Sequence, residues 1–237
     1  KQFNEEWKKR GRNPWVDENG VEIKDFLQKR IKQSDAYKMY VEKYGENSDS
    51  LKIMLKLKKP MTIFTWNGER DTTFSSFDSL NYYKRFLQTG LMSMDPNTGH
   101  IKAWVGGFNH KYFKFDHVRQ GKRQPGSTFK AFIYGLAIES NYSPCHQMID
   151  ISPQFSMPGQ PDWYPMNANG TRGSGKKMTI RQAMAQSVNA ISAQLMKDLG
   201  EENVVEFAHR MGIESNLDAV PSLCLGTSDV SLFEMVG

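Results

Sequence analysis

The stretch RQPGSTFKAFIYGLAIES, residues 123–140, decides how this sequence is interpreted. Pro125 and Gly126 both disfavour the interior of a helix, whereas the apolar run after them is typical of a buried helix. Ser127 therefore lies where a helix is expected to begin, and Lys130 follows three positions later. Because residues three apart in a helix share one face, with Cβ atoms about 5–6 Å apart, the spacing predicts a hydroxyl and an amine side by side.

A hydroxyl and an amine in that position suit nucleophilic catalysis. Backbone N–H groups without helical partners and the positive end of the helix dipole stabilise negative charge on the Ser127 oxygen. Burial lowers the pKa of a lysine, so that a neutral Lys130 can accept the serine proton. We therefore expect Ser127 to be a nucleophile and Lys130 its base. A serine that only caps the helix fits this pattern equally well when the pattern is taken alone.

A second pair with the same spacing, Ser174 and Lys177, lies in a glycine-rich segment where no helix is expected to fix its geometry. We expect this pair to lie in a mobile loop away from the site. Its presence shows that the Ser-x-x-Lys spacing by itself has little specificity.

The sequence also contains a candidate second element. Nucleophiles in Ser-x-x-Lys motifs act together with a Ser-x-Asn element and a Lys-Thr-Gly element. Ser187 and Asn189 form such an element downstream of Ser127, at an expected break between two helices. We expect both side chains to approach Lys130 and to relay a proton, although a capping role for Ser187 is the alternative. Another match, Ser79 to Asn81, precedes the nucleophile in an amphipathic helix and is not expected to take part.

Composition and charge exclude several classes of protein. The chain is 38% hydrophobic and 12% aromatic, which is enough for a folded core. No apolar run approaches the roughly 20 residues of a membrane span, and residues 1–12 lack the apolar region of a signal peptide. We expect the piece to be soluble, with any targeting segment removed or lying upstream.

The net charge of +5 arises in the first third, where residues 1–70 hold 16 Lys and Arg against 11 Asp and Glu. A solvated helical linker fits this excess better than a nucleic-acid surface, because no stacking aromatics alternate with the lysines. Cys145 and Cys224 match neither a disulfide framework nor a metal site, and one disulfide or two thiols both stay open. The histidines form no ligand cluster, so no metal site is expected.

Periodicity and turn signals predict helices alternating with hairpins. Alternating runs around Asn67-Gly68 and around residues 96–99 predict two β-hairpins. The apolar run SLCLG, residues 222–226, predicts a short buried strand, and residues 152–177 predict a long surface loop. Apolar residues at helical spacing predict helices near residues 23–31, 34–45, 51–55, 79–87, 127–140, 179–186, 190–199 and 203–211, and a last one capped by Ser228 or Asp229.

Together these motifs resemble the transpeptidase region of class A penicillin-binding proteins. The run RQPGSTFK (123–130) is similar to the nucleophile motif of that family, and MTIRQAMAQSVNA (178–190) is similar to the segment with its second motif. The resemblance also includes MDPNTGHIKAWVGG (94–107), which is similar to the hairpin ahead of the nucleophile, and LGTSDVSLFEMVG (225–237), which is similar to the segment after the second motif.

The resemblance implies an α/β fold of the α+β type, like that of β-lactamases and transpeptidases, with an antiparallel sheet packed with helices and a mostly helical subdomain. Residues 60–237 are then a partial penicillin-binding transpeptidase domain. Residues 1–59, which include RNPW (12–15), resemble less strongly the basic helical linker that joins it to a glycosyltransferase domain.

The activity that the resemblance implies is D,D-transpeptidation of peptidoglycan stem peptides through a serine acyl-enzyme, with β-lactam antibiotics acylating the same serine. Ser127 would be the nucleophile, Lys130 the base, Ser187 a proton shuttle, and Asn189 the group that holds the Lys130 amine and the substrate amide. No cofactor, metal or nucleic acid is implied. The parent protein is expected at the outer face of the bacterial cytoplasmic membrane, anchored upstream, with a glycosyltransferase activity of its own.

One departure from the family is that no Lys-(Ser/Thr)-Gly triplet occurs in the 237 residues. We therefore expect a fragment that ends before the third motif, and that is weakly active or inactive by itself. Other hypotheses remain open at this point. One is a serine β-lactamase, which would share Ser127 and Lys130 but would also need a base that activates water. A second is a non-catalytic β-lactam sensor or glycan-binding scaffold that keeps the motifs. A third is a structural role, in which the basic helices of residues 1–59 dock a partner.

Overall fold

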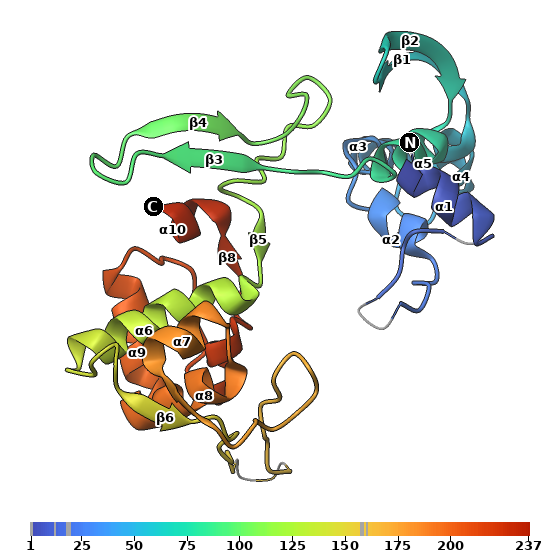
Figure 1. Cartoon of the computed structure of the whole chain (residues 1–237). Coiled ribbons are helices and arrows are strands. Elements are labelled where there is room, and N and C mark those ends of the chain that lie inside the picture. The colour runs from blue at the N-terminus through green and yellow to red at the C-terminus, as the bar shows by residue number, and fades with distance from the viewer. Residues whose placement is uncertain (1, 12, 18–19, 157–158, 160) are drawn as a thin grey trace. The chain divides into compact units, whose positions relative to one another are not determined.

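The structure, a computed structural model, describes residues 2–11, 13–17, 20–156, 159 and 161–237 (Figure 1). The chain divides into two compact units, Lys1–Gln88 and Thr89–Gly237. The boundary expected at residues 59 and 60 is therefore wrong, because the first hairpin and the helix after it belong with the basic helices. In the described ranges, no helix is long and apolar enough to cross a lipid bilayer.

The first unit begins with helices that pack around a small core of Ile31, Tyr40, Leu51 and Leu55. Two of these helices begin with serine caps, since Ser34 accepts from the backbone of the third helix and Ser48 from that of the fourth. Residue 12 of the expected RNPW motif lies outside the described residues. The helices around this core are α2 (Phe26–Ile31), α3 (Asp35–Tyr44) and α4 (Asp49–Lys56), and α1 (Gln2–Lys9) precedes them in the chain.

The first hairpin consists of β1 (Lys59–Thr65) and β2 (Gly68–Phe74), paired antiparallel. Its turn is formed by residues 66 and 67, one position earlier than expected. Helix α5 (Ser76–Lys84) follows and packs against α2 and α4. It begins before residue 79, the expected start, because Ser75 and Asp78 form a reciprocal capping box, in which each side chain accepts from the backbone N–H of the other.

The second unit contains three antiparallel strand pairs and a group of helices. The mixed fold class is confirmed, but the strands of the described residues form separate two-stranded ladders instead of one sheet: β3 pairs with β4, β5 with β8, and β6 with β7. The elements are β3 (Leu91–Met94), β4 (Ile101–Val105), β5 (Lys122–Arg123), the 3₁₀ helix η1 (Gly126–Phe129), α6 (Lys130–Glu139), β6 (Gln147–Ile149), β7 (Lys177–Thr179), α7 (Ile180–Ala185), α8 (Asn189–Leu199), α9 (Glu201–Arg210), the 3₁₀ helix η2 (Pro221–Leu225), β8 (Val230–Ser231) and α10 (Leu232–Val236).

The core of the second unit surrounds α6, which packs against α7, α8 and α9 (Figure 1). Phe129 and Ile133 are fully buried there, as are Ile191 and Leu195 of α8. Full burial of a side chain of this size contributes about 1.5–3 kcal/mol. The apolar run that follows Ser127 in the sequence therefore anchors the start of α6 in the core of this unit.

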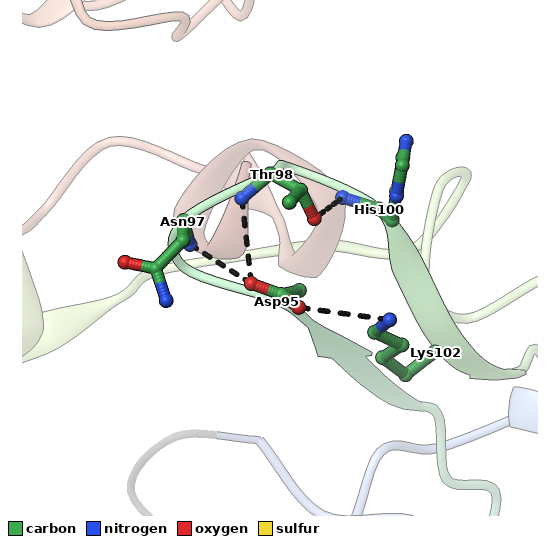
Figure 2. Close-up of polar contacts among 5 residues, drawn as sticks. All are labelled: Asp95, Asn97, Thr98, His100 and Lys102. Atoms are coloured by element: carbon green, nitrogen blue, oxygen red, sulfur yellow. Dashed lines mark hydrogen bonds and ion pairs between the residues drawn. The ribbon is translucent and has the colours of Figure 1, made fainter.

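The β3–β4 hairpin has a turn organised by one carboxylate (Figure 2). Asp95 Oδ1 accepts from the backbone N–H groups of Asn97, at 2.9 Å, and Thr98, at 3.3 Å, while Lys102 lies 3.6 Å from its other oxygen. These hydrogen bonds form an Asx-type turn, which is the reason why Asp and Asn favour such positions. The second predicted hairpin is confirmed.

Two predictions near the C-terminal end of this chain are wrong. SLCLG lies in η2 and is not a strand; Pro221 stands at its first turn, where a missing N–H is tolerated. The last helix is capped by Ser231 and not by Ser228 or Asp229, because Ser231 forms a capping box with Glu234.

Glu234 is the acceptor for a cluster of donors. Its carboxylate accepts from the backbone N–H and hydroxyl groups of both Ser231 and Ser215, at 2.6–2.9 Å, and from the N–H of Glu214 at 3.0 Å. Partial burial opposes ionisation, but the hydrogen bonds from Ser231 and Ser215 outweigh it and lower the pKa of Glu234 from 4.5 to about 2. The ionised form is therefore favoured by folding.

We predict that Glu234→Gln lowers the free energy of unfolding at pH 7 by about 1–2 kcal/mol, after allowance for screening by solvent. A pKa lowered by folding stabilises the protein above the unfolded pKa, and this stabilisation is lost as the pH falls from 4.5 toward 2. Urea denaturation at pH 7 and pH 3 should therefore show a smaller difference between variant and parent at the lower pH. Glu206→Gln, on the exposed face of α9, is the control. A difference that does not shrink with pH contradicts the prediction.

Candidate active site

The predicted nucleophile lies in the turn that leads into α6. Ser127 is exposed in η1, and Lys130 is the first residue of α6. The turn is fixed internally by the hydroxyl of Thr128, which donates to the carbonyl of Pro125 at 2.7 Å. Ser127 is therefore at the start of a helix, with a 3₁₀ turn in place of the expected first α-helical turn.

The amine of Lys130 is the centre of the site. The side chain is only 3% exposed. Its Nζ donates to the carbonyl oxygen of Ser187 at 2.7 Å, to Ser187 Oγ at 3.0 Å and to Asn189 Oδ1 at 2.6 Å. The structure thus brings Lys130, Ser187 and Asn189 together across 57–59 positions of sequence.

No direct hydrogen bond between Ser127 and Lys130, the pair expected side by side, is among the contacts of the described residues, because the lysine side chain is directed at the Ser187–Asn189 turn. An ammonium has three N–H donors, and Lys130 has an acceptor for each of them. A neutral amine has two donors and a lone pair, so loss of one proton would free one of these contacts. The lone pair could then accept a proton from a hydroxyl.

Burial of Lys130 shifts its amine in the direction of that neutral form. Burial lowers the pKa of Lys130, and only a negative charge on the neighbouring Cys224 would oppose this shift. Burial also raises the pKa of the fully buried Cys224 thiol to about 12, so this neighbour is uncharged at neutral pH. Cys224 and Cys145 are both free thiols, which excludes the disulfide that the sequence left open.

Ser187 has a backbone conformation that is rare for a residue with a side chain. Its φ is 54°, in the left-handed region. The end of α7 holds it there, because Ser187 N–H donates to Met184 at 3.0 Å and Val188 N–H donates to Ala183 at 2.9 Å. This conformation directs both the carbonyl and the hydroxyl of Ser187 at Lys130. Strain of this kind is characteristic of functional sites.

Gly226 fixes the turn that carries Ser127 from the other side, a role that the sequence did not predict. Gly126 N–H donates to the Gly226 carbonyl at 3.2 Å. Gly226 has φ 71°, and a Cβ at this position would lie 2.1 Å from the Gly126 carbonyl oxygen. Only glycine allows this approach. The segment 225–237, already noted for its resemblance, contained the signal, since it begins with Leu225-Gly226.

The second Ser-x-x-Lys pair lies only partly in a loop, because Ser174 precedes β7 and Lys177 is its first residue. Ser174 N–H donates to the buried Asp150 carboxylate at 2.7 Å, and Lys177 begins β7, where it pairs with Ile149. No hydrogen bond among the described residues joins this pair to Ser127 or Lys130. Residues 157, 158 and 160 of the same loop lie outside the described residues.

The described part of the chain has no group of three or more His, Cys, Asp or Glu side chains that could hold a metal ion. The site consists of a hydroxyl, an amine, a second hydroxyl and an amide. This set of groups can perform nucleophilic attack with proton transfer.

Comparison with known families places the site in context. Residues 10–87 match the family described as the penicillin-binding protein middle domain, and residues 89–220 match the penicillin-binding protein transpeptidase domain. The two matched ranges meet at the boundary between the structural units. The second range contains all four candidate residues.

Individual relatives agree with this match. Penicillin-binding protein 2D of Bacillus subtilis is 38% identical over 151 residues, 63% of this chain and 22% of that protein. Penicillin-binding protein 1A of Rickettsia felis is 36% identical over 146 residues, 61% of this chain and 18% of that protein. The crystal structure of penicillin-binding protein 1A from Haemophilus influenzae is similar with a TM-score of 0.58 and 28% identity, covering 73% of this chain and 25% of that one.

We predict that Ser187→Gly gives a more stable protein than Ser187→Ala, by about 1 kcal/mol. Both remove the hydroxyl, but only glycine adopts a positive φ without steric penalty. Urea denaturation measures the difference. The matched pair Ser140→Gly and Ser140→Ala, at φ −83°, should show the reverse order. If the alanine variant at residue 187 is the more stable one, the strain is not present.

We also predict that Gly226→Ala lowers the free energy of unfolding by about 2–4 kcal/mol, from the positive φ and from the clash with Gly126 together. The control is Gly99→Ala, at nearly the same φ of 70° but with no atom within 4 Å of the added Cβ. Gly99→Ala should lower it by only about 1–2 kcal/mol. Equal losses in thermal or urea denaturation would show that the approach to Gly126 is unimportant.

Proposed function

Because the chain belongs to the penicillin-binding protein transpeptidase family, we propose that Ser127 and Lys130 perform the acyl transfer of a serine D,D-transpeptidase acting on peptidoglycan stem peptides. The observation that carries the proposal is the convergence of Ser187 and Asn189 on the buried amine of Lys130. A helix cap alone would not require a lysine to be buried and held in this way.

In the proposed reaction, Ser127 Oγ attacks the carbonyl carbon of the D-Ala-D-Ala peptide bond. A C–O bond forms, and the serine proton passes to the neutral amine of Lys130. The C–N bond then breaks, and the leaving D-Ala amine receives a proton through the Ser187 hydroxyl. An amine from a neighbouring stem attacks the resulting ester, which forms the cross-link and returns a proton to Ser127.

Two groups of this chain would stabilise the reacting atoms. The first N–H groups of a helix have no intrahelical acceptor, so the backbone N–H of Ser127 is suited to one half of an oxyanion hole. Asn189 Oδ1 would hold the Lys130 amine, with its amide also serving the substrate. The Lys-(Ser/Thr)-Gly element of the family, which is absent from these 237 residues, would supply the other half and the partner of the substrate carboxylate.

The whole protein is the subject of further proposals. The chain spans 18–22% of the curated relatives described above, which are themselves named penicillin-binding proteins. We propose that the parent also carries a peptidoglycan glycosyltransferase, is anchored to the membrane and works at the outer face of the bacterial cytoplasmic membrane. β-Lactams would acylate Ser127 in the same way as the stem peptide, without release of a leaving group.

We predict that a fluorescent penicillin labels the full-length protein at Ser127, and that Ser127→Ala abolishes the label on a gel. Ser174→Ala, the serine of the other Ser-x-x-Lys pair, is the matched control and should be labelled normally. The 237-residue chain alone should be labelled roughly 100- to 1,000-fold more slowly, since loss of one oxyanion donor has an effect of that size.

Three results would contradict the proposal in different ways. Label that persists in Ser127→Ala means that another residue is the nucleophile. Rapid release of the label as hydrolysed penicillin indicates a β-lactamase. Stable labelling of a protein that fails to cross-link stem peptides in the same preparation indicates a sensor or scaffold.

A further inference from the structure

Helix α8, which carries Asn189, is capped by a side chain from the preceding loop. Asn167 Oδ1 accepts from the backbone N–H of Asn189 at 2.9 Å and from that of Ala190 at 3.1 Å. These are the first two N–H groups of the helix, which have no intrahelical acceptor. The N-cap residue, Val188, has no polar side chain and makes no cap hydrogen bond. The cap is therefore supplied by a residue 22 positions away.

The same loop fixes which way the Asn189 amide points. Asn189 Nδ2 donates to the Met166 carbonyl at 2.8 Å. A carbonyl can only accept, so the amide nitrogen must face Met166 and the amide oxygen must face Lys130. The oxygen lies 2.6 Å from Lys130 Nζ. The backbone position and the amide orientation of Asn189 are thus both set by residues 166 and 167.

Asp150 in turn fixes the amide of Asn167. Its Oδ1 accepts from Asn167 Nδ2 at 3.0 Å, and its Oδ2 accepts from Ser174 N–H at 2.7 Å. An ionised carboxylate is an acceptor only, so it holds the nitrogen of the Asn167 amide toward itself and leaves the oxygen for α8. Asp150 is 4% exposed, and its backbone is held as well: its N–H donates to the Lys176 carbonyl, and its carbonyl accepts from Gly175 N–H. Gly173 lies so close to the backbone carbonyl of Asp150 that a side chain at residue 173 would clash with it.

We propose that Asp150 and Asn167 are positioning residues for the base: they orient Asn189, whose amide oxygen in turn holds the amine of Lys130 at the Ser187–Asn189 turn. The inference rests on the proposed function, because it assigns these residues to the geometry of the acylation step. Residues 166, 167 and 174, between β6 and β7, thereby have a role in this chain beyond connecting two strands.

The arrangement offers a test by exchange of the two residues. In Asp150→Asn, the new amide nitrogen faces one of the two donors, Asn167 Nδ2 or Ser174 N–H, that the carboxylate accepted from. In Asn167→Asp, the carboxylates of residues 150 and 167 face each other. The double variant Asp150→Asn/Asn167→Asp restores a donor opposite an acceptor at each contact. Asn169→Asp, in the same loop, is the control, because Asn169 Oδ1 only accepts from Thr171 and a carboxylate can do the same.

The measurement is the acylation of the full-length protein by penicillin over a range of concentrations. We expect each single variant to reduce the limiting acylation rate about 10- to 100-fold with no change in the half-saturating concentration, since misplacement by about 1 Å has an effect of this order. The double variant should recover most of the rate, and Asn169→Asp should match the parent. Circular dichroism and the labelled fraction give the amount of folded protein, to which each rate is normalised.

Two sets of results overturn the inference. One is single variants that lose labelled fraction but acylate at the parent rate per folded molecule, which would mean that Asp150 and Asn167 serve stability alone. The other is a double variant that folds poorly or is no faster than the single variants. Failure of the proposed function is recognised separately, because then the parent protein itself is not acylated at Ser127.

Discussion

The arrangement of the site depends on keeping the amine of Lys130 out of water. A buried ammonium without partners is strongly unfavourable, and burial is tolerated only where hydrogen bonds replace those to water. Lys130 meets this condition with three acceptors taken from one short turn, Ser187 to Asn189. The break between α7 and α8 is needed at Ser187, because in a continuous helix the Ser187 carbonyl would accept from a backbone N–H of the helix and not from Lys130.

Two backbone features follow from that constraint. Ser187 has to be in the left-handed region for its carbonyl and hydroxyl to face the same amine. On the other side of the site, the turn that carries Ser127 is fixed by the contact of Gly126 with Gly226 and by the pairing of β5 with β8. The proposed base, Lys130, and the proposed nucleophile, Ser127, are therefore held by different segments of the chain, and neither position depends on a contact between their side chains.

Predictions from the sequence succeeded where the cause is local. The helices near residues 34–45 and 179–186 and both hairpins depend on residues within a few positions of each other. The strand predicted for SLCLG, residues 222–226, is wrong because a short apolar run fits a strand or a buried 3₁₀ helix equally well. The domain boundary predicted near residue 59 is wrong because it followed the end of the basic segment, whereas α5, which lies beyond it, packs on α2 and α4. The capping of α8 by Asn167 depends on a contact between distant segments, which no local pattern contains.

Within the proposed mechanism, the three acceptors of Lys130 are not equivalent. The Ser187 carbonyl can only accept, and the Asn189 amide oxygen is held as an acceptor because its nitrogen is bound to Met166. Ser187 Oγ is a hydroxyl and is able to change from acceptor to donor. When Lys130 is neutral, its lone pair can therefore be matched without any heavy atom moving far, by rotation of the Ser187 hydroxyl. A proton passing between Lys130 and the leaving amine has one route through these three groups, and this route is the reason why a serine, and not merely a carbonyl, belongs at residue 187.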